Sequence, residues 1–463
     1  MVGMSKTYRP WNVDQAMLLP PSVQELVPAG HLAHFVRDLV RDELDLSAIL
    51  ADYAEERGYP PYHPVMMAAL LLYSYCQGIY SSRRIAAACE QRLDFMAVTA
   101  LQQPDFRTIS DFRKRHLTAL GGLFVQVLAL CEQAGLVKLG HVALDGTKIK
   151  ANASKHKAMS YGRMKQREPE LAAEVQKWLE QAAAEDAAED KALGRERRGD
   201  ELPEWVTNKQ KRQAKIQEAM AALEAEAAVQ APAVADEPDP GAPLADDAGG
   251  DEQAATPVPE SPPPPAAPAP PDKAQRNFTD PESRIMKTPN GFEQAYNAQA
   301  AVDADSQVIV AAGLTNAGND KQQLAPMAAQ IETNTGRTPQ EMSVDNGYCS
   351  EDNLEELERR GIRGYVATGR QKHGTASATG KGAGRAGSRV QRMSRRLKQG
   401  GHRSRYRLRK QTVEPVFGQI KGARGFRQFH LRGLTKVADE WNLICLAHNL
   451  LKLAKAGSVA GCG

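Results

Sequence analysis

The chain has 463 residues, which is long enough for about two to four domains and a sizeable core. Its formal net charge is +3. Because the overall charge is almost neutral, any surface for nucleic acid must be local. Six scattered cysteines show no CxxC spacing, which predicts reduced thiols, no zinc site and a cytoplasmic protein. The first residues lack the pattern of a signal peptide, and the longest apolar run, Val65–Tyr73, is too short to cross a bilayer.

Helical patterns fill the segment from about His31 to Leu136, so we expect a helical N-terminal domain over residues 1–136. Pro64–Tyr75 is almost wholly apolar, which predicts a helix buried on several sides. We expect Ser81 or Ser82 to cap the helix after it.

A basic helix is predicted within Gln103–Leu120, with Thr108 as its cap. Arg113, Lys114 and Arg115 follow one another along it. Two short helices, the second of them basic, suit contact with DNA. A solvated charged face on a helical bundle would read the same way, and the sequence leaves both interpretations open.

A short buried strand is predicted at His141–Lys150, and it carries one acid, Asp145, followed by Gly146. An acid inside a sheet is costly unless it is paired or holds a metal ion, although a turn aspartate would also fit here. Glu341–Ser350 repeats the pattern with Asp345, and Ser350 is expected to cap the next helix.

A β-hairpin is expected between these two strands, from Tyr296–Val302 and Gln307–Ala312, with the turn acids Asp303 and Asp305 interpreted as structural. A helix should begin at Asp320, which we interpret as its cap, with an indirect role at the site as the alternative. Together these elements predict an α+β or α/β fold with a mixed sheet over residues 137–154 and 276–455.

An insertion of about 120 residues interrupts this sheet domain. Residues 155–230 carry one narrow apolar stripe per predicted helix, which indicates a helical hairpin. Residues 231–275 are rich in Pro, Ala, Asp and Glu and are expected to be disordered. The insertion could mediate self-association or could be neutral, and the sequence does not decide.

The segment Arg370–Lys410 contains fourteen Lys or Arg and no acid, which predicts that it needs solvent or a polyanion, so we interpret residues 369–405 as a DNA-contact stretch. Its GAGRAG sequence opens no apolar helix and is discarded as a dinucleotide site. A helix is predicted over Tyr406–Lys421, with Glu414 beside its apolar face, Lys421 two turns further on, and a kink or boundary at Pro415.

Asp145, Asp345 and Glu414 therefore stand at the ends of two strands and on a helix that could converge. Carboxylates are the ligands that Mg²⁺ prefers, and two such ions, for which Mn²⁺ can substitute, are able to activate an attacking oxygen and stabilise a leaving oxygen of a phosphodiester. Lys421 would then neutralise a nearby phosphate.

Four motifs are similar to those of bacterial insertion-sequence transposases of the DDE class: LDGT at Leu144–Thr147, YNAQAAVD at Tyr296–Asp303, VDNGY at Val344–Tyr348, and VEPVFGQIK at Val413–Lys421. The N-terminal helical region resembles these enzymes as well. The resemblance implies a ribonuclease H-like catalytic domain in which Asp145, Asp345 and Glu414 are the metal-binding catalytic triad. It further implies cleavage of DNA at the element's terminal repeats, strand transfer into target DNA, a dimer or larger assembly on DNA, no membrane partner, and a place at the bacterial nucleoid.

The match to the family's Tyr/Arg/Glu/Lys signature is incomplete. Lys421 has the position of the signature lysine, but Lys410 and Arg407 occupy the signature positions of the arginine and the tyrosine. Tyr406 and Arg409 each come one residue early, so either set could supply the contacts to DNA. Tyr348 is expected either to contact DNA or to pack, and Trp441 to pack.

Three other functions fit the same sequence. A ribonuclease H-like nuclease would cut without joining, a DNA-binding regulator would carry a dead site, and an assembly protein would use the 165–230 hairpin without binding DNA.

Overall fold

The computed structural model describes residues 22–53, 61–193, 204–230, 269–369 and 387–460. The chain forms two compact units. Residues 1–151, 286–291 and 295–463 make the first, here called the sheet unit, and residues 152–285 and 292–294 make the second, the arm unit. The N-terminal helices, which the sequence separates at residue 136, share the sheet unit with the mixed sheet. None of the described helices is long and apolar enough to span a membrane.

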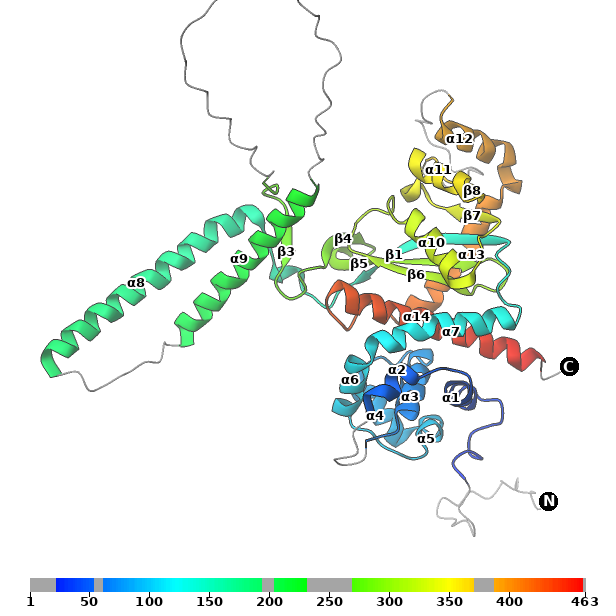
Figure 1. Cartoon of the computed structure of the whole chain (residues 1–463), viewed down its shortest axis with the longest axis horizontal. Coiled ribbons are helices and arrows are strands. Elements are labelled where there is room, and N and C mark those ends of the chain that lie inside the picture. Colours follow the sequence, from blue (N-terminus) through cyan, green and yellow to red (C-terminus); the bar gives the residue numbers. More distant parts are fainter. Residues whose placement is uncertain (1–21, 54–60, 194–203, 231–268, 370–386, 461–463) are drawn as a thin grey trace, which may run out of the picture. The chain divides into compact units, whose positions relative to one another are not determined.

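The N-terminal part of the sheet unit is helical, as predicted (Figure 1). Its helices are α1 Leu32–Asp42, α2 Ser47–Leu50, α3 Pro64–Cys76, α4 Ser82–Gln91, α5 Leu93–Thr99, α6 Phe106–Arg115 and α7 Leu117–Gln133. Helix α3 is buried along nearly its whole length, which the apolar run 64–75 predicted. The cysteines among the described residues are free thiols.

The two predicted helix caps in this region differ from the structure. Ser81 occupies the N-cap position of α4, but its side chain makes no capping hydrogen bond. The prediction that Thr108 caps the basic helix was wrong, because α6 begins earlier and Asp105 accepts hydrogen bonds from the backbone N–H of Arg107 (2.7 Å) and Thr108 (3.1 Å). An aspartate at the N-cap satisfies donors that the first turn leaves open.

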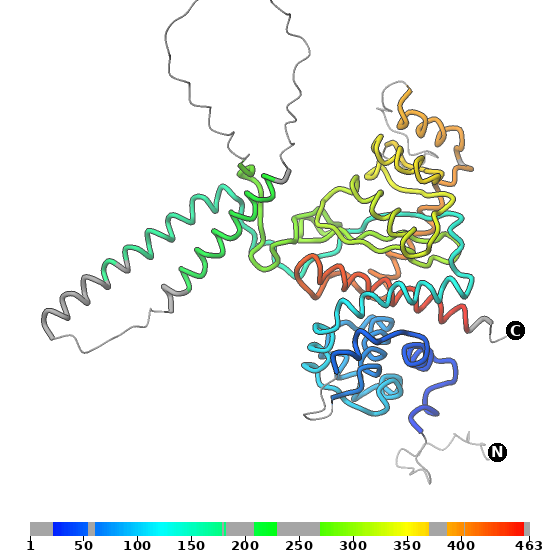
Figure 2. Tube along the Cα trace, viewed as in Figure 1, coloured from blue at the N-terminus to red at the C-terminus, as the bar shows by residue number. Residues whose placement is uncertain are grey.

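The sheet unit contains a mixed sheet, as predicted, and this sheet has six strands. Its strands are β1 His141–Lys150, β4 Arg284–Thr288, β5 Gly291–Asp303, β6 Ile309–Thr315, β7 Glu341–Val344 and β8 Arg363–Val366. The order is β4-β5-β1-β7-β8, with β6 also on β5. Strand β1 runs antiparallel to β5 and parallel to β7. Its neighbours come from distant parts of the chain, so the colours change abruptly across the sheet in Figure 2.

Helices cover this sheet and tie it to the N-terminal region (Figure 1). They are α10 Leu324–Thr335, α11 Glu351–Arg359, α12 Arg389–Gly400, α13 Leu408–Gly418 and α14 Leu434–Ala460. Helix α14 packs on α7 and on β6, and its Trp441, which is fully buried, donates a hydrogen bond to the backbone oxygen of Gln299 on β5 (2.9 Å). Ser350 caps α11 by accepting from the N–H of Asn353, as predicted.

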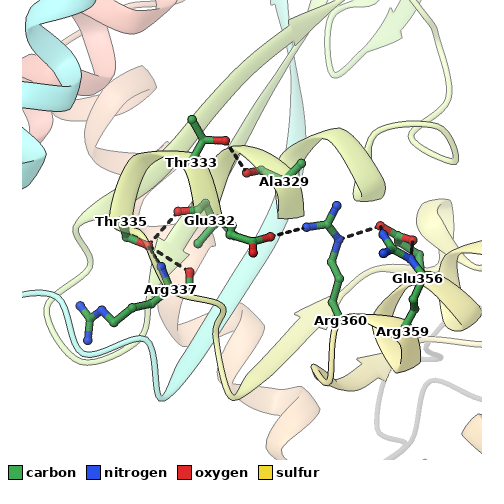
Figure 3. Close-up of polar contacts among 9 residues, drawn as sticks. Ala329, Glu332, Thr333, Thr335, Arg337, Glu356, Arg359 and Arg360 are labelled. Atoms are coloured by element: carbon green, nitrogen blue, oxygen red, sulfur yellow. Dashed lines mark hydrogen bonds and ion pairs between the residues drawn. The ribbon is translucent and has the colours of Figure 1, made fainter.

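Ion pairs join helices α10 and α11 (Figure 3). The guanidinium of Arg360 donates to Glu332 on α10 (2.8 Å) and to Glu356 on α11 (2.6 Å). Arg359 also pairs with Glu356 (2.7 Å), and together the two arginines lower the pKa of Glu356 to about 2. Arg359 and Glu332 are more than half exposed, so each of their pairs contributes little to stability.

The described part of the basic segment is a packed helix. Residues 370–386 lie outside the described residues, but α12 buries Met393 and Leu397. Its first backbone N–H groups, at Arg389 and Val390, donate to Glu351 of α11. Arg389 and Arg392 of α12 pair with acids of α11, whereas Arg395, Arg396 and Lys398 are exposed to solvent. A contact of residues 369–405 with DNA stays a prediction.

The arm unit contains the two long helices that the periodicity predicted, α8 Tyr161–Leu193 and α9 Glu204–Gln230. They pack through a small apolar cluster that includes Met164, Leu171 and Ile216. A two-stranded sheet of β2 Ala158–Ser160 and β3 Gln275–Asn277 joins the ends of the arm. The predicted disordered segment lies, for residues 231–268, outside the described residues.

Removing Trp441 should destabilise the sheet unit. We expect Trp441→Ala to lower the free energy of unfolding by about 3–5 kcal/mol, because a large buried ring leaves a cavity between α14 and the sheet. Urea unfolding followed by circular dichroism measures this change. Phe292→Ala is the control, since Phe292 is 64% exposed and should change the midpoint little; equal effects of the two substitutions would contradict the predicted role.

Candidate active site

The two strands that carry the predicted aspartates lie side by side. Strands β1 and β7 are parallel neighbours, and Leu144 is paired with Val344. Asp145 and Asp345 directly follow these two residues, so the register sets the two acids side by side: Asp145 lies in the middle of β1, and Asp345 comes directly after the end of β7. The pairing register thus brings together two residues that are 200 positions apart in the sequence.

Asp145 is largely buried, and its negative charge is only partly compensated by its neighbours. Its carboxylate accepts a hydrogen bond from the N–H of Gly146 (2.9 Å) and forms an ion pair with Arg409 of α13. Burial raises the pKa of Asp145 to about 7, and the charges of Asp345 and Asp320 add to the rise, whereas Arg409 and the Gly146 N–H oppose it. The free-energy cost of removing the Asp145 carboxylate from water is therefore larger than the stabilisation that the ion pair with Arg409 provides.

Arg409 links the first strand to the helix. Its Nη1 pairs with Asp145, and its Nη2 lies 3.5 Å from the carboxylate of Glu414 on the same helix. Burial raises the pKa of the largely buried Tyr406, and the charge of Arg409 opposes that rise. Although burial works to lower it, the pKa of Arg409 is raised, chiefly by Asp145. Of the two candidate pairs, the structure thus places Tyr406 and Arg409 at the acids.

Glu414 lies on α13, which carries the predicted apolar face of Val413, Val416, Phe417 and Ile420. The side chain of Glu414 is 48% exposed, the most open of the three predicted acids. Pro415 does not end the helix, because α13 continues to Gly418 and then widens into a π-helical turn, Gln419–Ala423. A π turn inside a helix shifts the phase of the residues after it.

Asp345 is held in place by the backbone at the end of β7. It precedes a single 3₁₀ turn, Asn346–Tyr348, and accepts a hydrogen bond from the N–H of Gly347 (2.7 Å). Burial raises its pKa, with the charge of Asp320 adding to the rise, while the Gly347 N–H and Arg409 oppose it. A fixed carboxylate next to Asp145 is the expected arrangement for a site that binds cations.

Asp320 is a fourth acid at this site, where the alternative interpretation of its role placed it. The interpretation of Asp320 as a helix cap was wrong, since α10 begins at Leu324 after Gln323. The Oδ1 of Asp320 accepts hydrogen bonds from Asn297 (2.6 Å) and Gln299 (2.8 Å) on β5 and lies 3.7 Å from the Nζ of Lys148.

The side-chain amides of Asn297 and Gln299 on β5 are fully buried beside β1. Gln299 is paired with Gly146, where an added Cβ would lie 2.7 Å from Asp320 Oδ1 and 2.8 Å from Asn297 Oδ1. Only glycine leaves room for this group. Alternation in the YNAQAAVD motif was the available signal, because Asn297 and Gln299 share one face of a strand. Tyr348 is buried, donates its hydroxyl hydrogen bond to Gln299, and so packs within the protein.

The predicted basic residues separate into two groups. Lys421 donates hydrogen bonds to Thr147 Oγ1 (2.6 Å) and to the backbone oxygen of Lys148 (2.8 Å), so it lies over the end of β1. Burial lowers the pKa of Lys421 to about 8, and the charge of Lys148 adds to the effect. Lys410 and Arg407 are exposed on the surface of the sheet unit.

The N-terminal candidates are similarly divided. Arg113 is buried, and its Nη1 donates to the backbone oxygen of Tyr80 (2.7 Å), which gives it a structural place between α6 and the loop before α4. Lys114 and Arg115 are exposed, and Arg115 pairs with Asp52 (3.3 Å). We therefore leave Arg113 out of any surface for DNA.

The donor set suits a hard divalent cation, because it consists of carboxylates without a His or Cys cluster. Two buried polar atoms at the site, Asn297 Oδ1 and Arg409 Nε, have no hydrogen-bond partner in the described structure. As the side chains stand, no three His, Cys, Asp or Glu residues of the described ranges are grouped to hold a metal ion. Arg409, which contacts both Asp145 and Glu414, keeps these acids as ion pairs.

Comparison with protein-family models gave two matches. Residues 21–115 match a transposase domain of the DUF772 type, and residues 264–450 match a transposase DDE domain. Together these ranges cover more than half of the chain. The chain belongs to the DDE transposases of insertion sequences. Asp345, Glu414 and Lys421 lie inside the matched DDE range, whereas Asp145 precedes the insertion and is joined to them by strand pairing. Comparisons with curated proteins and with solved structures found no match.

The stability of this transposase should depend on the protonation of Asp145. In the folded protein Asp145 holds its proton up to about pH 7, whereas the unfolded chain releases it near the ordinary value of 3.8. The native state then binds more protons between these values, so this residue's contribution to stability falls as the pH rises through that window.

We expect Asp145→Asn to remove this contribution. In metal-free buffer, the stability of Asp145→Asn relative to the unaltered protein should rise between about pH 5 and pH 8, by on the order of a few kcal/mol. Urea midpoints at several pH values measure the difference. Asp305→Asn is the control, because that turn acid is 58% exposed; a pH-independent difference for Asp145→Asn would contradict the raised pKa.

Proposed function

We propose that this protein is a Mg²⁺-dependent DNA transposase that cuts DNA at the ends of its element and joins the new 3′ end to target DNA. The observation that carries the proposal is the pairing of Leu144 with Val344, which sets Asp145 beside Asp345, together with Arg409, which brings Glu414 of α13 to the same place. Membership of the DDE transposases supports the reaction class.

A ribonuclease H-like catalytic domain is part of the proposal. Its support is the mixed sheet, in which β1 carries the first acid and lies between an antiparallel partner, β5, and a parallel partner, β7. The third acid comes from a helix that packs on β1. Strand, strand and helix thus supply the three carboxylates from separate parts of the chain.

Asp145, Asp345 and Glu414 would hold two Mg²⁺ ions, with Mn²⁺ as a substitute. When bound, the ions activate the attacking oxygen and stabilise the leaving oxygen of the phosphodiester. Asp320, with its hydrogen-bond partners Asn297 and Gln299 on β5, would support the site from beneath β1 without binding the ions. Without metal ions, Arg409 supplies the positive charge that pairs with Asp145. We propose that Arg409 contacts a phosphate of the DNA when metal ions replace it as the partner of Asp145.

Lys421 has a separate task at the end of β1. Its pKa, lowered to about 8 by burial and by Lys148, would return toward the ordinary value beside a phosphate, because an anion stabilises the charged amine. We propose that Lys421 and Tyr406 position the DNA strand, while Lys410, Arg407, Lys114 and Arg115 contribute to the surrounding charge. Two element ends must be held together, so we propose a dimer or larger assembly on DNA in the bacterial cytoplasm.

Glu414→Gln should abolish cleavage while leaving DNA binding intact. The substrate is a duplex that contains the element's own terminal repeat, incubated with Mg²⁺, and the product is read on a denaturing gel. We expect cleavage to fall by at least about a hundredfold, because a metal ligand contributes several kcal/mol to the transition state. A pre-cut duplex with a free 3′ hydroxyl tests joining separately from cutting.

Glu43→Gln is the matched control, since Glu43 is an exposed glutamate at the end of α1. Equal cleavage by the unaltered protein and by Glu414→Gln would reject Glu414 as a ligand. Cutting without joining would leave a nuclease, and specific binding without cutting would leave a regulator.

Binding of Mg²⁺ or Mn²⁺ should stabilise the folded protein by mass action. We expect the thermal midpoint to rise with Mn²⁺ concentration and to return when a chelator removes the ion. The double variant Asp145→Asn/Asp345→Asn should show no such rise. If the rise persisted unchanged in this variant, the ions would bind elsewhere.

A further inference from the structure

A polar cavity of about 410 Å³ lies apart from the acids, between the start of α4 and the chain that comes after the π turn. Three arginines line it: Arg84, Arg424 and Arg427. Within the described residues none of them forms an ion pair with an acid, in contrast to the arginines of α12, which pair with Glu355 and Glu358. The cavity therefore concentrates positive charge that the protein itself does not neutralise.

The three arginines differ in how they reach the cavity. Arg84 and Arg427 are exposed, and Arg427 is oriented by a hydrogen bond from its Nε to the backbone oxygen of Lys421 (3.0 Å). Arg424 is only 8% exposed, and its Nη2 has no hydrogen-bond partner in the described structure. A buried cation without an acid is costly, and an anion in the cavity would reduce that cost.

The backbone at this wall also favours an anion. Ser81 precedes α4 and lines the cavity, yet its side chain does not cap the helix. The first N–H groups of a helix have no partner within the helix and carry partial positive charge, so an uncapped start suits a phosphate oxygen. Here this feature is joined, in one cavity, to three arginines that have no acid partner among the described residues.

The walls of the cavity are rigidly joined. At Gly78, whose φ is +72°, an added Cβ would lie 2.7 Å from the backbone oxygen of Arg424. Tyr80 donates a hydrogen bond to that same oxygen (3.1 Å), and Arg113 holds the backbone oxygen of Tyr80 from the other side (2.7 Å). This explains the burial of Arg113, which fixes the loop before α4 instead of contacting DNA itself.

The cavity is continuous along the chain with the active site. Lys421 lies over β1, and the lining residues Gly422–Gly425, Arg427 and Gln428 come directly after it. Gln428 is bridged to Lys150, the last residue of β1, and donates to the backbone oxygen of Ala151 (3.2 Å). A strand of DNA engaged at the acids and at Lys421 would therefore meet this cavity next.

We propose that this cavity binds a phosphate of the DNA backbone next to the scissile position, with Arg84 and Arg427 as its accessible ligands. The inference rests on the proposed function, because it takes DNA as the substrate of the neighbouring acids. Such a contact orients the strand without reading its sequence. It gives the N-terminal region a defined contact with DNA through the start of α4.

The test is DNA binding without cleavage. A fluorescently labelled duplex of mixed sequence is titrated with the protein in Ca²⁺ at several salt concentrations, and binding is read by fluorescence anisotropy. The double variant Arg84→Gln/Arg427→Gln should bind about tenfold more weakly, and the slope of log affinity against log salt should fall by about one for each phosphate that the variant no longer neutralises. Both arginines are exposed, so the variant should keep its thermal midpoint.

Arg83→Gln is the matched control, because Arg83 is the exposed neighbour of Arg84 on α4 but packs over the ring of Phe106 (5.2 Å). Equal weakening in the control and the double variant, or no weakening in either, would overturn the site while leaving the proposed function standing. A thermal shift with inorganic phosphate that is absent from the double variant, with DNA affinity unchanged, would identify a free-anion site and overturn the contact with DNA. No DNA binding by the unaltered protein would overturn both proposals.

Discussion

The burial of Asp145 in the central strand is the constraint on which the rest of the sheet unit depends. A carboxylate at this depth is expensive, and the folded protein tolerates it because Arg409 reaches it from α13. Helix α13 must therefore pack on β1, and it brings Glu414 with it. On the other side, Gly146 leaves the space in which Asp320 and the β5 amides lie. The raised pKa of Asp145 shows that these arrangements compensate the charge only partly.

Much of this site could be predicted from local patterns. Period-two alternation and short apolar runs identified β1 and β7, and hence Asp145 and Asp345, because a buried strand leaves its pattern in consecutive residues. The apolar face of α13 was also visible. The sequence could not decide between the two interpretations of Asp320, because its contacts depend on the register between β5 and β1, and register is set by contacts between residues far apart in the sequence.

Two other differences concern the basic residues. The spacing of the Tyr/Arg/Glu/Lys signature points to Lys410 and Arg407, whereas in the structure Arg409 of α13 pairs with Asp145 and Glu414. The basic segment was judged from its composition alone, whereas the acids that pair with Arg389 and Arg392 of α12 come from α11, about thirty residues earlier. Composition shows charge but does not show its partners.

The insertion after β1 has a consequence for how this enzyme can change. The chain leaves β1 at Lys150 and returns to its partner strand β5, and between them the pairing of Ala158 with Asn277 ties the two ends of the arm together. The entropy of closing a loop grows only with the logarithm of its length, so a clamped insertion of this kind can lengthen, shorten or be exchanged at little thermodynamic cost. Changes in the length or sequence of the arm therefore need not alter the pairing of β1, which carries Asp145, with β5. This junction is the natural place to graft a reporter domain or a different assembly module onto the transposase.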